Sequence, residues 1–292
     1  MKKTKILIPI YNDWQSVYKL LENIDRDLHG WDADIAVIII NDASTEKKTA
    51  NSSIFKNLSS VKIINMKKNK GHTRCIAAGL KYINEKEDFD FVIPMDGDGE
   101  DRPAELGSLL CKAYENPTIA ITGNRVKRSE GFFFKFCYLF HKCLTYMFTG
   151  QSIKFGNYSC LPKNIVMKMI NEPATWSSFS GALSKISKVR LSIPSTRGSR
   201  YFSPSQMNFI SLLKHSLSII AVFKKSLLIR TTIFLIFYLF FVIEYLSMIT
   251  LIPFFFVLVM MILALQLSRR ENIEELNKSL ENINSIENMK IN

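Results

Sequence analysis

The residues best suited to chemistry lie in FDFVIPMDGDGEDRPAE (89–105), where a short apolar run ends at Asp96, Asp98, Glu100 and Asp101. Unpaired charge is too costly for a protein core, so these side chains are expected to face a ligand. Carboxylates at this spacing suit a hard divalent cation, Mg²⁺ or Mn²⁺, held by Asp96, Asp98 and Glu100. Such ions usually accompany phosphates, so the run predicts a metal site for a phosphate-bearing ligand.

The elements around this run alternate between strand and helix patterns. Apolar runs predict strands at 5–10, 35–40, 61–66 and 89–95, and helical spacing predicts helices at 13–28 and 73–84. This alternation predicts an α/β fold with a mostly parallel, Rossmann-like sheet. The first three strands end in polar residues at 11–13, 41–44 and 69–71. Turn chemistry explains any one of these ends, but four polar ends on the ligand-binding edge of such a sheet favour function.

The middle of the chain carries a predicted helix at 103–114 and a predicted strand at 118–128 that ends in a basic cluster. Between 131 and 148, aromatic residues are interrupted by Lys135, His141 and Lys142. This pattern predicts a helix lying in the membrane interface, with an ordinary core helix as the alternative. A second amphipathic, juxtamembrane helix is predicted at 205–225, so the globular domain is expected to span 1–204.

An apolar block runs from Thr231 to Leu267. As one helix it would be roughly 55 Å long at about 1.5 Å per residue, against a hydrocarbon core of about 30 Å. The block therefore predicts two membrane helices within 226–268, turning near 244–250. Basic residues flank both ends, at 224–230 and at 269–270, which places both flanks and the globular domain in the cytoplasm of a multi-pass inner-membrane protein. The remaining residues, 269–292, are predicted to be a polar cytoplasmic tail, which from Glu271 on is a frayed helix or disordered.

The composition limits the classes of binding partner that are expected for this protein. The 292 residues carry a formal net charge of +12 and are 47% hydrophobic. With a membrane segment present and no nucleic-acid-binding motif, the basic excess favours a lipid bilayer and an acidic substrate over nucleic acid. The five cysteines show no metal-binding spacing and read as reduced residues of a cytosolic domain. Association into a homo-oligomer remains open.

Four strand ends, IPIYND, INDAS, NKGH and MDGDGEDRP, occur in this order. With them, the sequence resembles the family 2 glycosyltransferases of the GT-A fold. The terminal hairpin makes it similar to the polyprenyl-phosphate glycosyltransferases, such as dolichol-phosphate mannose synthases and bacterial enzymes acting on undecaprenyl phosphate. The resemblance covers residues 4–268 and implies inverting, metal-dependent sugar transfer from a nucleotide sugar to polyprenyl phosphate at the cytoplasmic membrane face.

The resemblance also implies roles for individual residues. Those implied for the nucleotide sugar are Pro9, Tyr11, Asn12, Asp13, Asp42, Gly71 and Arg74. Those implied in catalysis are Asp96, Asp98, Asp101, Arg125 and Arg128, with Asp98 as the direct metal ligand; Arg128, Arg197 and Arg200 are implied in binding the lipid phosphate. The chain departs from the family pattern at Asp13, Asn41, Glu100, Arg102 and Asn157, of which Asn157 replaces an aspartate.

The acceptor decides whether that aspartate is needed. A phosphate monoester arrives largely as a nucleophilic dianion, whereas a sugar hydroxyl needs a base to remove its proton. Asn157 therefore favours a phosphate acceptor and cations to bind it, although the arginines could instead contact lipid headgroups without a catalytic role. His72 either contacts the diphosphate or is structural. The alternatives are a transferase acting on a hydroxyl of a lipid-linked glycan and a non-catalytic nucleotide-sugar-binding scaffold. The residues do not identify the sugar or the nucleotide.

Overall fold

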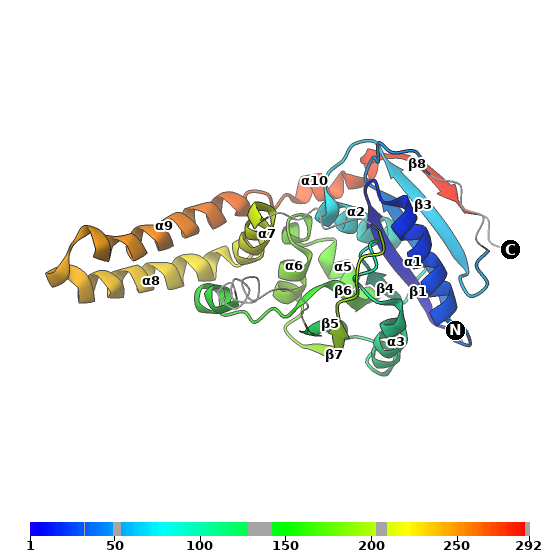
Figure 1. The fold of residues 1–292 in the computed structure, drawn as a ribbon, viewed down its shortest axis with the longest axis horizontal. Helices are drawn as coiled ribbons and strands as arrows, with labels where there is room; N and C mark the ends of the chain where they lie inside the picture. Colours follow the sequence, from blue (N-terminus) through cyan, green and yellow to red (C-terminus); the bar gives the residue numbers. More distant parts are fainter. Residues whose placement is uncertain (32, 49–53, 128–141, 203–208, 290–292) are drawn as a thin grey trace.

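The computed structural model describes residues 1–31, 33–48, 54–127, 142–202 and 209–289. A globular domain continues into a long pair of helices (Figure 1). Among the described residues the domain has one eight-stranded sheet in the order β7-β5-β6-β4-β1-β2-β3-β8. Its central strands are β1 (Lys3–Ile10), β2 (Asp34–Asn41), β3 (Ser60–Met66) and β4 (Phe91–Pro94), which pair in parallel. The predicted α/β fold with a mostly parallel sheet is therefore confirmed.

The connecting helices follow the predicted alternation. They are α1 (Trp14–Asp27), α2 (His72–Lys86) and α3 (Leu106–Glu115), the last preceded by a 3-10 turn, η1 (Pro103–Glu105). The sheet continues through β5 (Ala120–Lys127), β6 (Phe155–Pro162) and β7 (Arg190–Thr196), with β6 antiparallel to both β4 and β5. Between β6 and β7 lie α5 (Lys163–Met169), η2 (Pro173–Trp176) and α6 (Phe179–Ile186).

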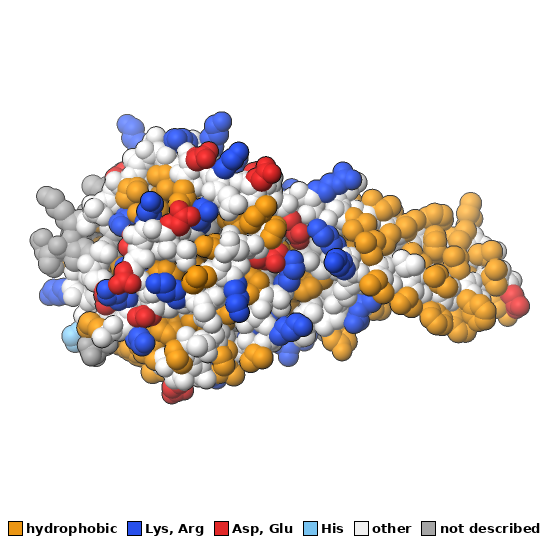
Figure 2. All heavy atoms as spheres, turned by 180° about the vertical axis from the view of Figure 1, so that it is seen from behind, with side chains coloured by type: hydrophobic (Ala, Val, Ile, Leu, Met, Phe, Trp, Pro, Cys, Tyr) orange, Lys and Arg blue, Asp and Glu red, His pale blue; other side chains and the backbone are white. Residues whose placement is uncertain are grey.

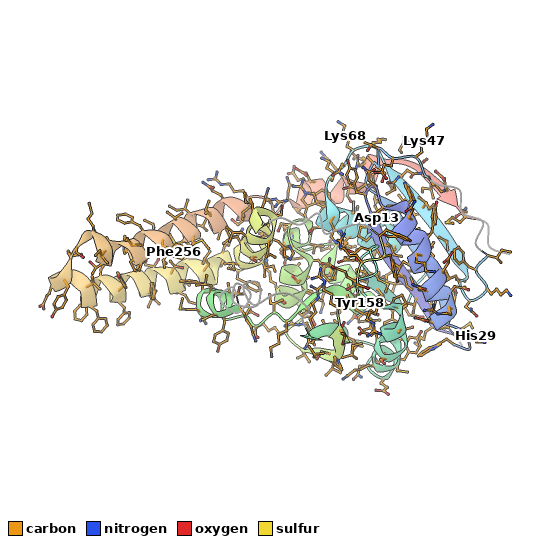
Figure 3. All side chains as sticks on the ribbon, in the orientation of Figure 1. Asp13, His29, Lys47, Lys68, Tyr158 and Phe256 are labelled. Carbon is orange, nitrogen blue, oxygen red and sulfur yellow. The ribbon has the colours of Figure 1, made fainter. Side chains whose placement is uncertain are left out.

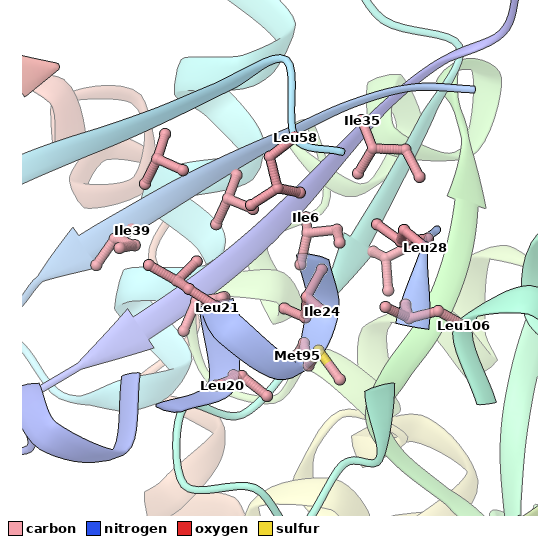
Figure 4. Packing of buried hydrophobic residues seen from close by; sticks show 14 of the residues in the cluster. Ile6, Leu20, Leu21, Ile24, Leu28, Ile35, Ile39, Leu58, Met95 and Leu106 are labelled. Carbon is pink, nitrogen blue, oxygen red and sulfur yellow. The ribbon is translucent and has the colours of Figure 1, made fainter. Parts of the chain in front are cut away.

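Two hydrophobic layers fix the sheet between these helices. Because successive strand residues point to opposite faces, Ile6 and Ile8 pack on the α1 and α3 side, whereas Leu7 packs against α2. Figure 4 shows the first layer, in which side chains of α1 lie against those of β1. On the other face, a Cβ at Gly79 of α2 would lie 2.4 Å from Leu7 Cδ1, so this glycine lets the helix approach the sheet closely.

The chain then leaves the domain through α7 (Phe209–Ala221) and forms a hairpin of α8 (Lys224–Val242) and α9 (Met248–Ser268), joined by η3 (Ile243–Tyr245). Both helical segments are long and apolar enough to cross a membrane. Their side chains are largely exposed, and Figure 2 shows hydrophobic atoms covering the hairpin, with Lys and Arg gathered near its base. The Ser247 hydroxyl caps α9 by accepting from the Thr250 N–H at 3.2 Å, and Pro253 lies near the start of that helix.

The interfacial helix predicted at 131–148 lies partly outside the described residues, which resume at 142. Residues 142–149 are helical, and their last carbonyls contact side chains of α8. Arg230 donates to the Met147 carbonyl at 3.3 Å, and the Ser226 hydroxyl donates to the Thr149 carbonyl at 3.1 Å. Phe148 packs with residues of α7, α8 and α9. The hairpin is therefore held against the globular domain at its base.

The prediction of a frayed helix or a disordered tail from Glu271 on is wrong. The segment forms α10 (Ile273–Asn277), η4 (Ser279–Asn282) and β8 (Ile283–Asn288), and β8 pairs antiparallel with β3. Leu276 is fully buried, and Trp176 Nε1 donates to Glu275 at 2.9 Å. An edge strand faces solvent along one side, so it does not need the apolar pattern of a central strand. That is why INSIEN gave little strand signal.

Candidate active site

The carboxyl ends of β1 to β4 meet at one edge of the sheet, and the polar strand ends predicted from the sequence lie there. Asp13, labelled in Figure 3, precedes α1 at this edge, and Lys47 and Lys68 lie on the same side of the domain, away from His29. The side chain of Tyr11 is half exposed. Pro9 lies within β1, opposite Ile40 of β2. The edge therefore brings together the residues implied for the nucleotide sugar, with one exception described below.

Asp42 fastens the loop that follows β3. Asp42 as a whole is 3% exposed, and its carboxylate accepts from the backbone N–H groups of Lys70 and Gly71, each at 2.8 Å. Gly71 has a φ of 94°, which a residue with a Cβ adopts at a cost. Asp42 thus positions the loop that leads into α2 and His72.

Asn12 holds a second loop, formed by residues 42–48. Its side-chain oxygen accepts from the N–H groups of Thr45 and Glu46 at 2.8 and 3.1 Å, and its own N–H donates to the Ser44 hydroxyl at 2.9 Å. Asn12 and Ala43 both have positive φ, 52° and 55°, which is uncommon for residues other than glycine. Such conformations persist where surrounding bonds hold them, and they cluster at functional sites.

The acidic run becomes a tight loop, residues 96–101, after β4. The sequence folds this way because Gly99 has a φ of 90° and lies against a tyrosine ring: a Cβ there would be 2.5 Å from Tyr201 Cε2. The segment 197–201, which we call the basic strap, crosses this loop. Gly198 N–H donates to the Glu100 carbonyl at 2.8 Å, and Tyr201 N–H donates to the Asp98 carbonyl at 3.0 Å.

The basic strap also balances the charge of the acidic loop. Arg200 Nη2 lies 2.6 Å from Asp98 Oδ2 and its Nε lies 3.5 Å from Glu100, while Arg197 forms an ion pair with Glu100. Asp98 and Glu100 are each only 13% exposed at the side chain. Burial, followed by the nearby Asp96 charge, raises the pKa of Asp98. Two of the three arginines implied in lipid-phosphate binding, Arg197 and Arg200, therefore contact carboxylates implied in metal binding.

Asp96 faces a different set of partners. Its Oδ1 lies 3.2 Å from His72 Nε2 and accepts from Asn157 Nδ2 at 3.2 Å, and the Asn157 amide nitrogen lies 2.9 Å from the same His72 nitrogen. Burial alone would raise the pKa of Asp96, but the positive charges of His72 and Arg125 outweigh it and hold this pKa well below its usual range. The sequence pointed to His72 and Asn157 separately and missed their shared contact with Asp96.

Asp101 is buried beneath this loop. It is 5% exposed, and its Oδ2 accepts from the Asp96 N–H at 3.0 Å. Burial, followed by repulsion from Asp96, raises its pKa to about 8. Asp101 therefore holds the backbone of the acidic loop in place from its buried side, and in this structure it acts as a positioning residue.

The remaining predicted residues fall in three places. Arg125 of β5 lies beside Gly156, where a Cβ would be 3.1 Å from its guanidinium, so this glycine leaves room for the arginine next to Asp96. Arg128 lies outside the described residues. Arg74 stacks on the Trp176 ring at 5.3 Å and lines a cavity of about 410 Å³ between α2 and the C-terminal segment. Among the described residues, no hydrogen bond or ion pair joins Arg74 to the acidic loop.

Geometry alone does not complete a metal site. Among the described residues, no three His, Cys, Asp or Glu side chains are grouped so that they could hold a metal ion by themselves. The loop does offer carboxylate oxygens, the donor type that Mg²⁺ and Mn²⁺ prefer. This chemistry fits a hard cation whose other ligands come from a bound phosphate.

The fold of this chain is similar to that of two solved enzymes. One is glucosyl-3-phosphoglycerate synthase from Mycobacterium tuberculosis, in complex with Mn²⁺, uridine diphosphate and glucosyl-3-phosphoglycerate. The TM-score is 0.54 at 11% identity, covering 77% of this chain and 80% of that one. The other is mannosyl-3-phosphoglycerate synthase from Rubrobacter xylanophilus, with a TM-score of 0.53 at 11% identity, covering 76% and 72%.

At this identity the likeness to both structures shows the fold alone. The sequence itself gives the family, because residues 5–169, more than half of the chain, match the model of glycosyl transferase family 2. That region contains β1 to β4 and the acidic loop that follows them. The chain therefore belongs to glycosyl transferase family 2 and is a glycosyltransferase.

Proposed function

We propose that this glycosyltransferase moves a sugar, with inversion, from a nucleotide sugar to a polyprenyl phosphate at the cytoplasmic face of the membrane. The observation that carries the proposal is the pairing of the acidic loop with the basic strap, in a chain that continues into two exposed apolar helices. The carboxylates suit the donor side of the reaction, and the arginines suit an acceptor that is itself an anion. The hairpin keeps the domain beside a lipid acceptor.

The donor side rests on the acidic loop. Asp96, Asp98 and Glu100 would hold Mg²⁺ or Mn²⁺ together with diphosphate oxygens of the nucleotide sugar. The complex of the M. tuberculosis enzyme contains Mn²⁺ and uridine diphosphate, which supports a metal and a nucleotide in this fold. When bound, the cation supplies a Lewis acid that neutralises the charge developing on the leaving diphosphate. Tyr11, Asn12 and Asp13 are proposed to frame the base and ribose.

The acceptor side rests on cations near Asp96 and Asp98. Arg125, Arg197 and Arg200 are proposed to bind the acceptor phosphate, with Arg128 of the same basic cluster. Guanidinium groups match phosphate oxygens in a bidentate way, which positions the nucleophile. A phosphate dianion needs no base, so Asn157 can serve to hold Asp96 in place by donating from its amide to the carboxylate. Attack opposite the leaving diphosphate inverts the anomeric carbon.

The acceptor is tested with purified protein in nanodiscs, a panel of radiolabelled nucleotide sugars and undecaprenyl phosphate as the sole acceptor. We expect label in organic-extractable material, in a product that mild acid cleaves, because the sugar is then linked through a phosphate. A parallel reaction with undecaprenol, which carries a hydroxyl in place of the phosphate, is the control and should give no product. Transfer to undecaprenol, or to the hydroxyl of a lipid-linked glycan in a third reaction that supplies one, without any lipid-phosphate product would assign the enzyme to hydroxyl acceptors instead.

The membrane arrangement is also a proposal: a globular domain (1–204), a juxtamembrane helix (205–225) and a hairpin (226–268) whose ends both face the cytoplasm. Basic side chains at both ends of the hairpin support this orientation. A reporter inserted at Ser247 should behave as external, and one fused at the C-terminus as cytoplasmic. A cytoplasmic signal from position 247 would mean that the helices do not cross the membrane.

A further inference from the structure

We propose that the C-terminal strand β8, acting through Asn65, positions the 42–48 loop on the nucleotide side of the active site. The inference rests on the proposed function, in which Asn12, the residue that bonds to this loop, helps to frame the nucleotide. It assigns a task to residues 283–288, which follow the membrane hairpin and lie outside the matched family region. Glu287 and Asn65 are then positioning residues, since they act on the site through other side chains.

Glu287 joins β8 to the site by two routes. Its Oε1 accepts from Asn65 Nδ2 at 2.6 Å, and its Oε2 lies 2.9 Å from Lys48 Nζ, which belongs to the 42–48 loop. The Ser285 hydroxyl also accepts from Asn65 Nδ2, at 3.0 Å. These bonds follow from the strand register, which pairs Asn65 with Ser285 and Ile63 with Glu287. A side chain after the membrane hairpin thus contacts a loop near the start of the chain.

Asn65 connects β8 to the end of β2 through a hydrogen bond with Asn41. Asn41 Nδ2 donates to Asn65 Oδ1 at 2.9 Å, and Asn41 Oδ1 accepts from the Ser44 N–H at 3.1 Å. An amide can donate and accept at once, whereas an ionised carboxylate only accepts. This gives a reason for asparagine at position 41, where the family pattern has an acidic residue. With aspartate there, the Asn65 oxygen would face a second acceptor.

The last step reaches Asn12. Ser44, held by Asn41, accepts from the Asn12 N–H at 2.9 Å, and the Asn12 amide donates to the Thr45 hydroxyl at 2.9 Å. Asn12 and Ala43 both hold positive φ, so these bonds keep an uncommon backbone conformation in place. Losing the support from β8 is therefore expected to loosen the loop and weaken nucleotide binding. The basic strap is fastened by separate bonds to the acidic loop, so acceptor binding should change little.

The first experiment measures hydrogen exchange of the full-length protein without any ligand. Backbone amides of residues 42–48 should exchange faster in Glu287→Ala and Asn65→Ala than in the wild type, while those of the basic strap exchange equally. Asn284→Ala, a substitution in the same strand outside this network, is the matched control and should match the wild type. Lys48→Gln removes only the ion pair between Lys48 and Glu287 at the protein surface. It should therefore raise the exchange rate at 42–48 by less than the other two substitutions. Unchanged exchange at 42–48 in all three test variants would overturn the proposal.

The second experiment measures binding of UDP, GDP, CDP and dTDP with Mn²⁺ by calorimetry, followed by kinetics with the nucleotide that binds. Glu287→Ala should raise the donor Kd and KM about tenfold, since it removes two charge-assisted bonds. Neither kcat nor the lipid KM should change by more than about twofold. Glu287→Gln keeps the acceptor for Asn65 and should recover most of the affinity. Equal donor Kd in the wild type and Glu287→Ala would contradict the link to the nucleotide. Failure of the wild type to bind any of the four would refute the proposed function, while the exchange data would still decide the loop contact.

Discussion

Replacing Asp98 with asparagine should lower kcat by about a hundredfold to a thousandfold, the size expected when a group that stabilises developing charge is removed. Asparagine keeps the size of the side chain and can still accept from the Glu100 N–H, a bond of 2.9 Å in the native loop. Only the charge that would hold the cation is lost. Arg200 keeps a second carboxylate, Glu100, at 3.5 Å. The measurement is the rate of sugar transfer at saturating donor, with the melting temperature as a check on folding.

The matched control is Asp88→Asn, the same substitution at an exposed carboxylate paired with Lys3 just before β4. This variant should keep the wild-type rate, because Asp88 precedes β4 and the active site lies beyond its other end. EDTA should inactivate the wild type to about the level of Asp98→Asn, and added Mg²⁺ or Mn²⁺ should restore only the wild type. An Asp98→Asn enzyme that stays near full activity in EDTA would exclude the proposed metal site.

Replacing Gly99 with alanine is expected to reduce activity at least tenfold by displacing the basic strap. The new Cβ would lie 2.5 Å from Tyr201 Cε2, closer than real Cβ contacts allow, and the φ of 90° disfavours any residue with a side chain. Tyr201 cannot simply move away, because its hydroxyl accepts from Asn23 at 2.8 Å and its N–H bonds to the Asp98 carbonyl. Turnover and the lipid KM measure the effect.

Gly30→Ala separates backbone strain from this clash. Gly30 also has a positive φ, 79°, but nothing lies within 4 Å of a Cβ built there. The Gly30→Ala substitution should lower the free energy of unfolding by about 1 kcal/mol, the usual penalty for an alanine in the left-handed region. It should leave kcat unchanged. If Gly99→Ala and Gly30→Ala lost the same stability and both kept full activity, contact between the strap and the acidic loop would not matter for turnover.

The strands and the site edge could be predicted because both follow from local patterns. The strand of residues 35–40 is a continuous apolar run, as buried parallel strands tend to be, and Asp96 to Asp101 cannot belong to a core. The apolar block between Thr231 and Leu267 was too long for one span, which predicted two helices. Each of these inferences depends on neighbours in the sequence.

The contacts that could not be predicted join residues far apart in the chain. Nothing near Arg200 in the sequence indicates that it meets Asp98, because the pairing depends on how the strap crosses the loop. His72 and Asn157 are brought to Asp96 by α2 and β6, whose relative position is set by the packed sheet. Strand β8 was missed for the same reason: its partner β3 supplies the pairing, and only two of its six residues are apolar.

The position of β8 has a consequence for how this protein is synthesised. The ribosome delivers β3 early, but the strand that covers its open edge emerges only after both apolar helices. Until then, β3 exposes unpaired backbone N–H and C=O groups, which is the kind of edge that invites aggregation. The catalytic sheet is therefore completed only after the hairpin has been made. If the hairpin inserts into a membrane as proposed, the last pairing of the catalytic sheet, that of β8 with β3, takes place at the bilayer surface.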